Sequence, residues 1–115
     1  MAEAGMTPLM IASMYISDGE LRAQTCTTLL KLRANALTRD AKGFTALHRS
    51  VWSPAGHKTC QLLLDSNVDV NCENDAGETP LWTACFRNPT TATNPSICVE
   101  TLLQAGARVD IYTKM

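Results

Sequence analysis

Aromatic residues are scarce in this sequence. They make up 5% of its 115 residues, so leucine and alanine must supply most of the packing. No run of 18 apolar residues is present, which argues against a membrane-spanning helix. A basic excess is also missing, because 10 lysines and arginines are balanced by 11 acidic residues, and this argues against nucleic-acid binding. The length suits one compact domain.

Signals for secretion are absent as well. Residues 1–5 contain no basic segment that leads into a long apolar stretch, so no signal peptide is predicted. The five cysteines are odd in number, widely spaced and free of any Cys-x-x-Cys pair, unlike those of a secreted disulfide scaffold. Asn88 and Asn94 each precede a proline, which prevents glycosylation. Together these absences favour an intracellular, cytoplasmic protein, with the nucleus as an alternative.

The sequence does contain a repeat. Three segments open with a glycine followed two residues later by a threonine, at Gly5, Gly43 and Gly77, which are 38 and 34 residues apart. Each segment closes with a run of leucines, at residues 29–30, 62–64 and 102–103. Because three openings lie in register with three closings, the pattern is far more specific than a single Thr-Pro-Leu motif.

This pattern, Gly-x-Thr-Pro-Leu followed by Leu-Leu-x-x-Gly-Ala-x-Val-Asn/Asp, resembles the ankyrin repeat, whose period is about 33 residues. The resemblance covers essentially the whole chain and predicts one domain with repeats at about residues 4–39, 40–73 and 74–115. It implies an all-α fold, an α-solenoid of stacked helix–turn–helix units joined by β-hairpin loops. Three repeats are near the minimum for a stable stack, so we expect a piece of a longer array.

The residues at the ends of the predicted helices agree with this fold. Thr7 and Thr79 each place a capping hydroxyl directly before a proline at the first helical position. Asn67 and Gly106 suit the left-handed turn that ends the second helix of a unit. Arg33 holds the same place in the first unit and adopts this conformation poorly, so a distorted turn is predicted there.

The connections between the paired helices are longer than the family pattern implies, by about five, one and six residues. The extra residues lie near 15–24, 53–56 and 88–96. The last segment is rich in asparagine, proline and threonine and is predicted to be a loop. These insertions are either tolerated surface loops or part of a site for a partner.

Nothing in the sequence indicates catalysis. The resemblance implies that His48 makes a structural hydrogen bond within and between repeats, and His57 is expected to be a structural turn residue. Cys26, Cys60 and Cys85 are expected to be buried and to pack as small hydrophobes. No zinc-ligand set, catalytic triad, carboxylate pair or glycine-rich phosphate loop is recognisable. The chain is therefore predicted not to be an enzyme and to use no metal, cofactor or small-molecule substrate.

The resemblance also implies where a partner protein binds. Ankyrin proteins usually contact partners through the hairpin tips and the concave face formed by the first helices. Aromatic and arginine side chains are the usual anchors of such interfaces, and four of the six aromatic residues fall at these positions. Alternatively, these rings pack within the chain itself. The predicted partner-binding residues are Met6, Met14, Tyr15, Lys42, Phe44, Trp52, Asp75, Glu78, Phe86 and Arg87.

A modification site is also implied. The sequence from Leu64 to Asn71 resembles the ankyrin motif in which an oxygen-sensing asparaginyl hydroxylase modifies the hairpin asparagine, so Asn71 is a predicted hydroxylation site. Alternatively, Asn71 only makes hydrogen bonds in its hairpin. The predicted function is protein binding. Two alternatives are the substrate-recruiting part of a larger enzyme, such as a ubiquitin ligase, and a regulatory ankyrin array of a membrane channel or receptor.

Overall fold

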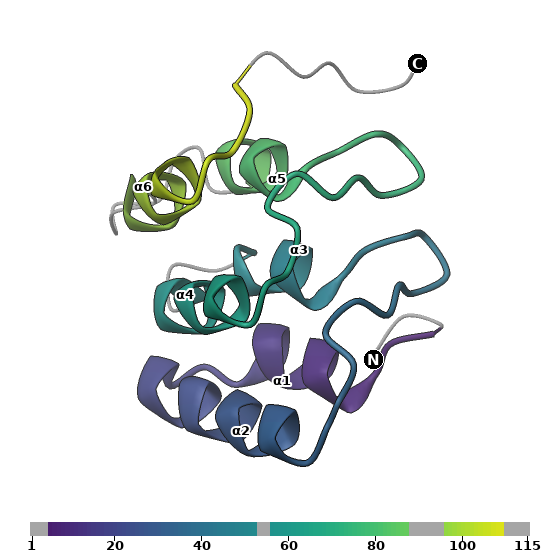
Figure 1. Ribbon diagram of the computed structural model, residues 1–115, viewed down its shortest axis with the longest axis vertical. Helices are drawn as coiled ribbons and strands as arrows, with labels where there is room; N and C mark the ends of the chain where they lie inside the picture. Colours follow the sequence, from purple (N-terminus) through teal and green to yellow (C-terminus); the bar gives the residue numbers. More distant parts are fainter. Residues whose placement is uncertain (1–4, 53–55, 88–95, 110–115) are drawn as a thin grey trace.

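The computed structural model describes residues 5–52, 56–87 and 96–109. Over these residues the chain forms six helices and no strand. Figure 1 shows the helices as three pairs stacked on one another. We call the pair α1 and α2 unit 1, the pair α3 and α4 unit 2, and the pair α5 and α6 unit 3. This arrangement confirms the predicted α-solenoid. The helices are α1 (Pro8–Tyr15), α2 (Gly19–Lys31), α3 (Ala46–Ser50), α4 (His57–Asp65), α5 (Pro80–Arg87) and α6 (Ser96–Gln104).

A threonine precedes the first helix of every unit. The Oγ1 atom of Thr7 accepts a hydrogen bond from Met10 N at 3.2 Å, and Pro8 occupies the first turn. Thr79 caps α5 in the same way, through Trp82 N at 3.2 Å. A capping hydroxyl satisfies a backbone N–H that has no partner inside the helix. The predicted helix starts are therefore confirmed.

A left-handed residue follows the second helix of every unit. Arg33, Asn67 and Gly106 have φ angles of 70°, 66° and 93°. The prediction of a distorted turn at Arg33 is wrong. The N–H groups of Arg33 and Ala34 donate to carbonyls of α2 at 3.0 Å, just as those of Gly106 and Ala107 donate to carbonyls of α6 at 3.0 and 3.1 Å. These bonds hold the arginine in a region that normally favours glycine.

The long connection in unit 1 is mostly helix. Helix α2 has 13 residues, whereas α4 and α6 have nine each. It starts early because the Asp18 side chain caps it, accepting two backbone N–H groups at 2.9 and 3.2 Å. Buried Arg22 then ties down the short loop by donating from Nε to Ile16 O at 2.6 Å. The extra residues near 15–24 thus form largely an extra turn of α2, while all but the last residue of each insertion at 53–56 and 88–96 lies outside the described residues.

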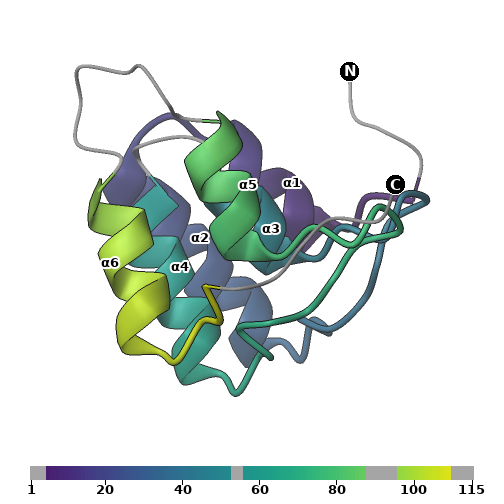
Figure 2. The same cartoon turned by 90° about the horizontal axis from the view of Figure 1, so that it is seen from above.

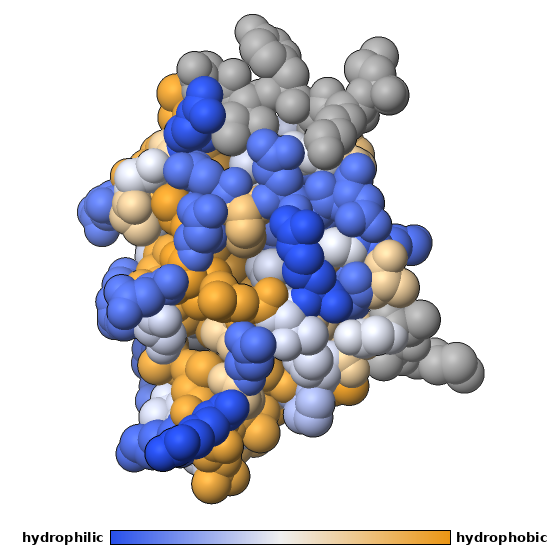
Figure 3. All heavy atoms as spheres, turned by 45° about the vertical axis from the view of Figure 1, so that its right-hand side comes forward, coloured by the Kyte–Doolittle hydropathy of each residue, from blue (hydrophilic) through white to orange (hydrophobic). Residues whose placement is uncertain are grey.

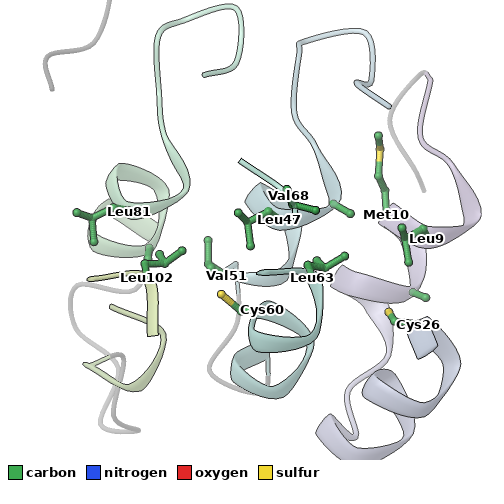
Figure 4. Packing of buried hydrophobic residues seen from close by; sticks show 13 residues of the cluster. Leu9, Met10, Cys26, Leu47, Val51, Cys60, Leu63, Val68, Leu81 and Leu102 are labelled. Atoms are coloured by element: carbon green, nitrogen blue, oxygen red, sulfur yellow. The ribbon is translucent and has the colours of Figure 1, made fainter. Parts of the chain in front are cut away.

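One continuous core runs through the stack. Figure 4 shows buried side chains from all three units lying in a row. Cys26 and Cys60 are fully buried at equivalent places in the second helices, as predicted. Cys85 is exposed, so its prediction as a buried thiol is wrong. The equivalent residue in unit 2, Val51, is buried under unit 3, and in the described part of the chain no unit follows unit 3. Neighbouring units therefore stabilise one another.

The loops between units project from the side of the first helices, away from the second helices (Figure 2). The loop before α3 is closed by a hydrogen bond from Asp40 N to Phe44 O at 2.9 Å. The loop before α5 has the same bond, from Asn74 N to Glu78 O at 3.0 Å. Among the described residues these hairpin loops are tight turns without β-strands.

Candidate protein-binding face

The hairpin loops and the adjoining side of α1, α3 and α5 form one surface, which we call the recognition face (Figure 2). Neighbouring hairpins touch through their backbones, since Asp75 N donates to Lys42 O at 3.0 Å. Glycine is required at this contact. Gly43 has a φ of 83°, and a Cβ atom there would lie 2.8 Å from Asp75 N. The spacing between the hairpins is therefore set by the backbone.

Side-chain oxygens stiffen each hairpin from within. Asp40 Oδ1 accepts hydrogen bonds from Lys42 N and Phe44 N, both at 2.9 Å. Asn74 Oδ1 takes the same role in the next hairpin, accepting from two backbone N–H groups at 3.0 and 2.9 Å. These side chains hold the tips in one shape. A pocket of about 320 Å³ opens between the two hairpins, lined by Lys42, Phe44, Asn74, Asp75, Ala76 and Glu78.

A buried ion pair lies beneath the hairpins. Arg49 pairs with Asp40, and neither side chain reaches solvent. The guanidinium carbon lies 4.3 Å from the centre of the Phe44 ring and 4.6 Å from that of Trp52. Burial raises the pKa of Asp40, but hydrogen bonds from Arg49 and from the backbone outweigh it and hold the pKa below its usual value. Arg49 also reaches unit 1, where its Nη1 lies 3.8 Å from Met14 Sδ.

His48 links unit 2 to unit 3. Its Nε2 lies 2.8 Å from Glu78 O and therefore carries the proton that is donated to this carbonyl. Its Nδ1 then accepts from the backbone N–H of Thr45 at 3.2 Å. Burial lowers the pKa of His48 to about 4, so the ring is neutral at physiological pH. The predicted hydrogen bonds within and between repeats are confirmed.

The first helices carry exposed aromatic rings. Tyr15 on α1 is 48% exposed, and Phe86 on α5 is 60% exposed. Phe86 stacks on Trp82 with ring centres 4.7 Å apart and an interplanar angle of 16°. Large exposed rings of this kind are the side chains that most often anchor protein interfaces.

Most of the predicted partner-binding residues have accessible side chains. Phe44 is the exception, because its ring is only 6% exposed and packs edge-on against Trp52. The ring of Phe44 therefore supports the face from below, and contact of Phe44 with a partner stays a prediction. The side chain of Arg87 lies outside the described residues. Met6, Met14, Trp52 and Glu78 are half-buried, and Tyr15, Lys42, Asp75 and Phe86 are exposed.

Asn71 has a structural role that the sequence left open. Its Oδ1 accepts a hydrogen bond from Arg108 N at 2.8 Å, which ties unit 2 to the turn after α6. Its own N–H donates to Asp69 Oδ1 at 2.9 Å. The side chain is half-buried. Hydroxylation of Asn71 stays a prediction.

Two residues of this region were not predicted from the sequence. Arg49 was missed, although it is charged and the equivalent residues in the other units, Ile11 and Thr83, are not. That contrast was the available signal. Trp82 was also missed, although its spacing of four residues from Phe86 puts both rings on one helix face.

The described residues offer little for chemistry. No group of three or more His, Cys, Asp or Glu side chains among them is placed to hold a metal ion. Burial raises the pKa of the Cys26 and Cys72 thiols, which works against a reactive thiolate. No helix in this part of the chain is long and apolar enough to cross a bilayer.

A stack of helix–turn–helix units with hairpin loops between them defines the class of repeat proteins that bind through an elongated face. The family model described as "Ankyrin repeats (3 copies)" matches residues 1–74, and the model described as "Ankyrin repeat" matches residues 76–114. The chain therefore belongs to the ankyrin repeat family. Modules of this family generally mediate protein–protein interactions.

Longer proteins resemble this chain in sequence or in structure. SMC5-SMC6 complex localization factor protein 1 from Homo sapiens is 34% identical over 101 residues, which are 86% of this chain and 9% of that protein. Human ankyrin repeat domain-containing protein 63 is 39% identical over 72% of this chain and 22% of its own length. The chain thus spans less than a quarter of these relatives. The crystal structure of the human ASB11 ankyrin repeat domain superposes with a TM-score of 0.76 at 23% identity, covering 93% of this chain and 43% of that one.

Proposed function

We propose that this chain binds a partner protein through its recognition face, with the hairpin tips and the exposed side of α1, α3 and α5 as the contact surface. The observation that carries the proposal is the exposure of Tyr15 and Phe86 on the first helices α1 and α5. Burial of these two rings against a partner would stabilise the complex, since each aromatic side chain contributes a large apolar area at an interface.

The support beneath the face favours the same function. Arg49, Asp40 and Phe44 form a buried base, and the Asp40 and Asn74 side chains hold the hairpin tips. A surface that is fixed before binding loses little conformational entropy when a partner docks. The variable residues on top then decide which partner fits.

The alternatives concern the protein in which the module works. A ligase or kinase that recruits its substrate, and a channel or receptor that carries a regulatory array, would both use the same face. One relative, SMC5-SMC6 complex localization factor protein 1, is by its name a factor for the localization of a complex. By analogy, we propose a protein or protein complex as the partner here, and neither a nucleic acid nor a lipid surface.

A paired substitution tests this function. Tyr15→Ser combined with Phe86→Ser removes the two exposed rings from the recognition face. Leu32→Ser combined with Leu103→Ser is the matched control, because these leucines are 75% and 42% exposed on the side of the second helices. Proximity labelling in cells should identify partner proteins of the parent chain that are lost with the first variant and retained with the control. Circular dichroism should show that both variants are folded. Equal labelling by the two variants would rule out the recognition face.

A further inference from the structure

The pocket between the two described hairpins lies within the stack, at the junction of units 2 and 3. Residues 42–44 form one wall and residues 74–78 form the other. We call this space of about 320 Å³ the hairpin pocket. Figure 3, in which the hairpin side comes forward, shows mainly hydrophilic residues to the right of centre. The separation of the walls is fixed, because Asp75 N donates to Lys42 O at 3.0 Å.

The hairpin pocket has an excess of negative charge. Its charged lining residues are Lys42, Asp75 and Glu78. In the described part of the chain, no ion pair involves any of these three residues. Two carboxylates therefore line the pocket together with one ammonium group.

The other charges near the pocket leave this excess unchanged. Asp40 forms the buried ion pair with Arg49, so neither contributes a free charge. Arg39 and Glu73 carry opposite charges and lie together, since the Arg39 guanidinium donates to the Glu73 carbonyl. A group that enters the pocket therefore meets a site that favours positive charge.

Only unit 3 carries both carboxylates. Counting from the opening glycines, the equivalent residues are Ala41 and Phe44 in unit 2 and Glu3 and Met6 in unit 1. Unit 2 forms a hairpin closed by the same backbone hydrogen bond without an acidic residue at either place. The fold therefore does not require the two acidic side chains.

The Glu78 side chain is held with one oxygen available. Asn74 Nδ2 donates to Glu78 Oε1 at 2.7 Å, and Glu78 N donates to Asn74 Oδ1 at 2.9 Å. Among the described residues, none donates a hydrogen bond to Glu78 Oε2. The carboxylate is thus oriented before a ligand arrives, and less conformational entropy is lost on binding.

Part of the pocket lining is apolar. Phe44 contributes its ring, which packs edge-on against His48 and Trp52 with ring centres 5.5 and 5.7 Å apart. An apolar ring beside two carboxylates suits a side chain that has a hydrocarbon stem and a cationic end, as lysine and arginine have. An acidic side chain would meet like charges, and an apolar one would remove water from the carboxylates without replacing its hydrogen bonds.

We infer that the hairpin pocket binds a basic side chain, lysine or arginine, of the partner protein. The hydrocarbon stem packs against Phe44, and the cationic group pairs with the Asp75 and Glu78 carboxylates. Hydrogen bonds between such charged groups are shorter and stronger than neutral ones. This assignment rests on the proposed function, because it names what the partner places between the hairpins.

Short peptides test the pocket directly. The probes are blocked pentapeptides of glycine with arginine, lysine or citrulline at the centre, and citrulline is the neutral counterpart of arginine. NMR titration of the parent chain should show saturable shifts of the Lys42, Asp75 and Ala76 backbone amides with the two basic peptides and none with the citrulline peptide. If neither basic peptide shifts these amides, or if citrulline shifts them equally, the inference is overturned.

Charge variants assign the effect to the carboxylates. Asp75→Asn combined with Glu78→Gln keeps the side-chain shapes and should weaken binding of the basic peptides by about threefold or more. Lys42→Gln should strengthen binding by about twofold, because it removes a like charge. Asp65→Asn combined with Glu100→Gln is the matched control, since it removes the same charges from exposed places on the second helices and should change nothing. Equal weakening by the two double variants would overturn the inference.

Proximity labelling in cells separates this inference from the proposed function. The partners of the parent chain should be lost with the Asp75→Asn, Glu78→Gln variant. Partners that are lost with Tyr15→Ser, Phe86→Ser but retained with the pocket variant would overturn the inference and leave the proposed function standing. Partners that are retained with both variants would overturn both.

Discussion

His48 makes the contact between units 2 and 3 sensitive to acid. In the folded chain its Nε2–H donates to Glu78 O, and its Nδ1 accepts from Thr45 N. Protonation would place a second N–H at Nδ1, facing the Thr45 N–H donor, inside a site that water does not reach. Burial of the ring, which disfavours the charged form, is the main cause that lowers its pKa to about 4.

The magnitude follows from the two pKa values. The unfolded chain binds the proton near pH 6.5 and the folded chain only near pH 4, so folding loses stability as the pH falls between these values. Each tenfold difference in proton affinity is worth about 1.4 kcal/mol, which gives a loss of about 2.5 kcal/mol between pH 7 and pH 4.5. Asp40 adds little above pH 4.5, because its carboxyl is largely ionised there both in the unfolded chain, with the usual pKa of 3.8, and in the folded chain, where the pKa is lower. This loss is large for a small domain, whose total free energy of unfolding is about 5–15 kcal/mol.

Urea titrations at a series of pH values measure the effect. The free energy of unfolding of the parent should fall across this window, while that of His48→Gln should start lower and depend much less on pH. His57→Gln is the matched control, since it removes the other histidine of the chain and should keep the parent's slope. A His48→Gln variant that loses as much stability in acid as the parent would refute the reasoning.

Three substitutions test other features by urea unfolding. Asp40→Asn leaves the buried Arg49 charge unpaired and should cost about 3–5 kcal/mol, and a cost below about 1 kcal/mol would contradict the buried pair. Arg33→Gly relieves a φ of 70° and should stabilise the chain by about 1 kcal/mol, whereas no gain would show that the turn carries no strain. Gly56→Ala places a Cβ atom in collision with Ser50 O and should cost more than about 2 kcal/mol, while a neutral result would contradict this close approach.

Features that depend on neighbouring residues could be predicted from the sequence. The Thr7 cap and the following proline act within one helical turn, so their pattern is readable in the chain. Asn67 and Gly106 were recognised for the same reason, because a left-handed turn is a property of one residue. The repeat made these local signals reliable, since each of them occurs in more than one unit.

Local reasoning failed where the structure overrides a weak preference. Arg33 adopts the left-handed conformation because hydrogen bonds to α2 outweigh its small intrinsic cost. The early start of α2 depends on the cap that Asp18 provides. Aspartate is a common capping residue, but the extra residues near 15–24 were interpreted as a loop. Both errors came from judging a residue by its type without its hydrogen-bond partners.

The family and the helix pairs were determined by the sequence alone, because they follow from periodicity and short-range capping. Only the tertiary structure decided which side chains remain accessible. Phe44 is buried under a hairpin and Cys85 is exposed, although each occupies a position that its repeat shares with the others. Burial depends on which unit packs against a given surface, and that contact joins residues more than 30 positions apart, as between Arg49 and Met14.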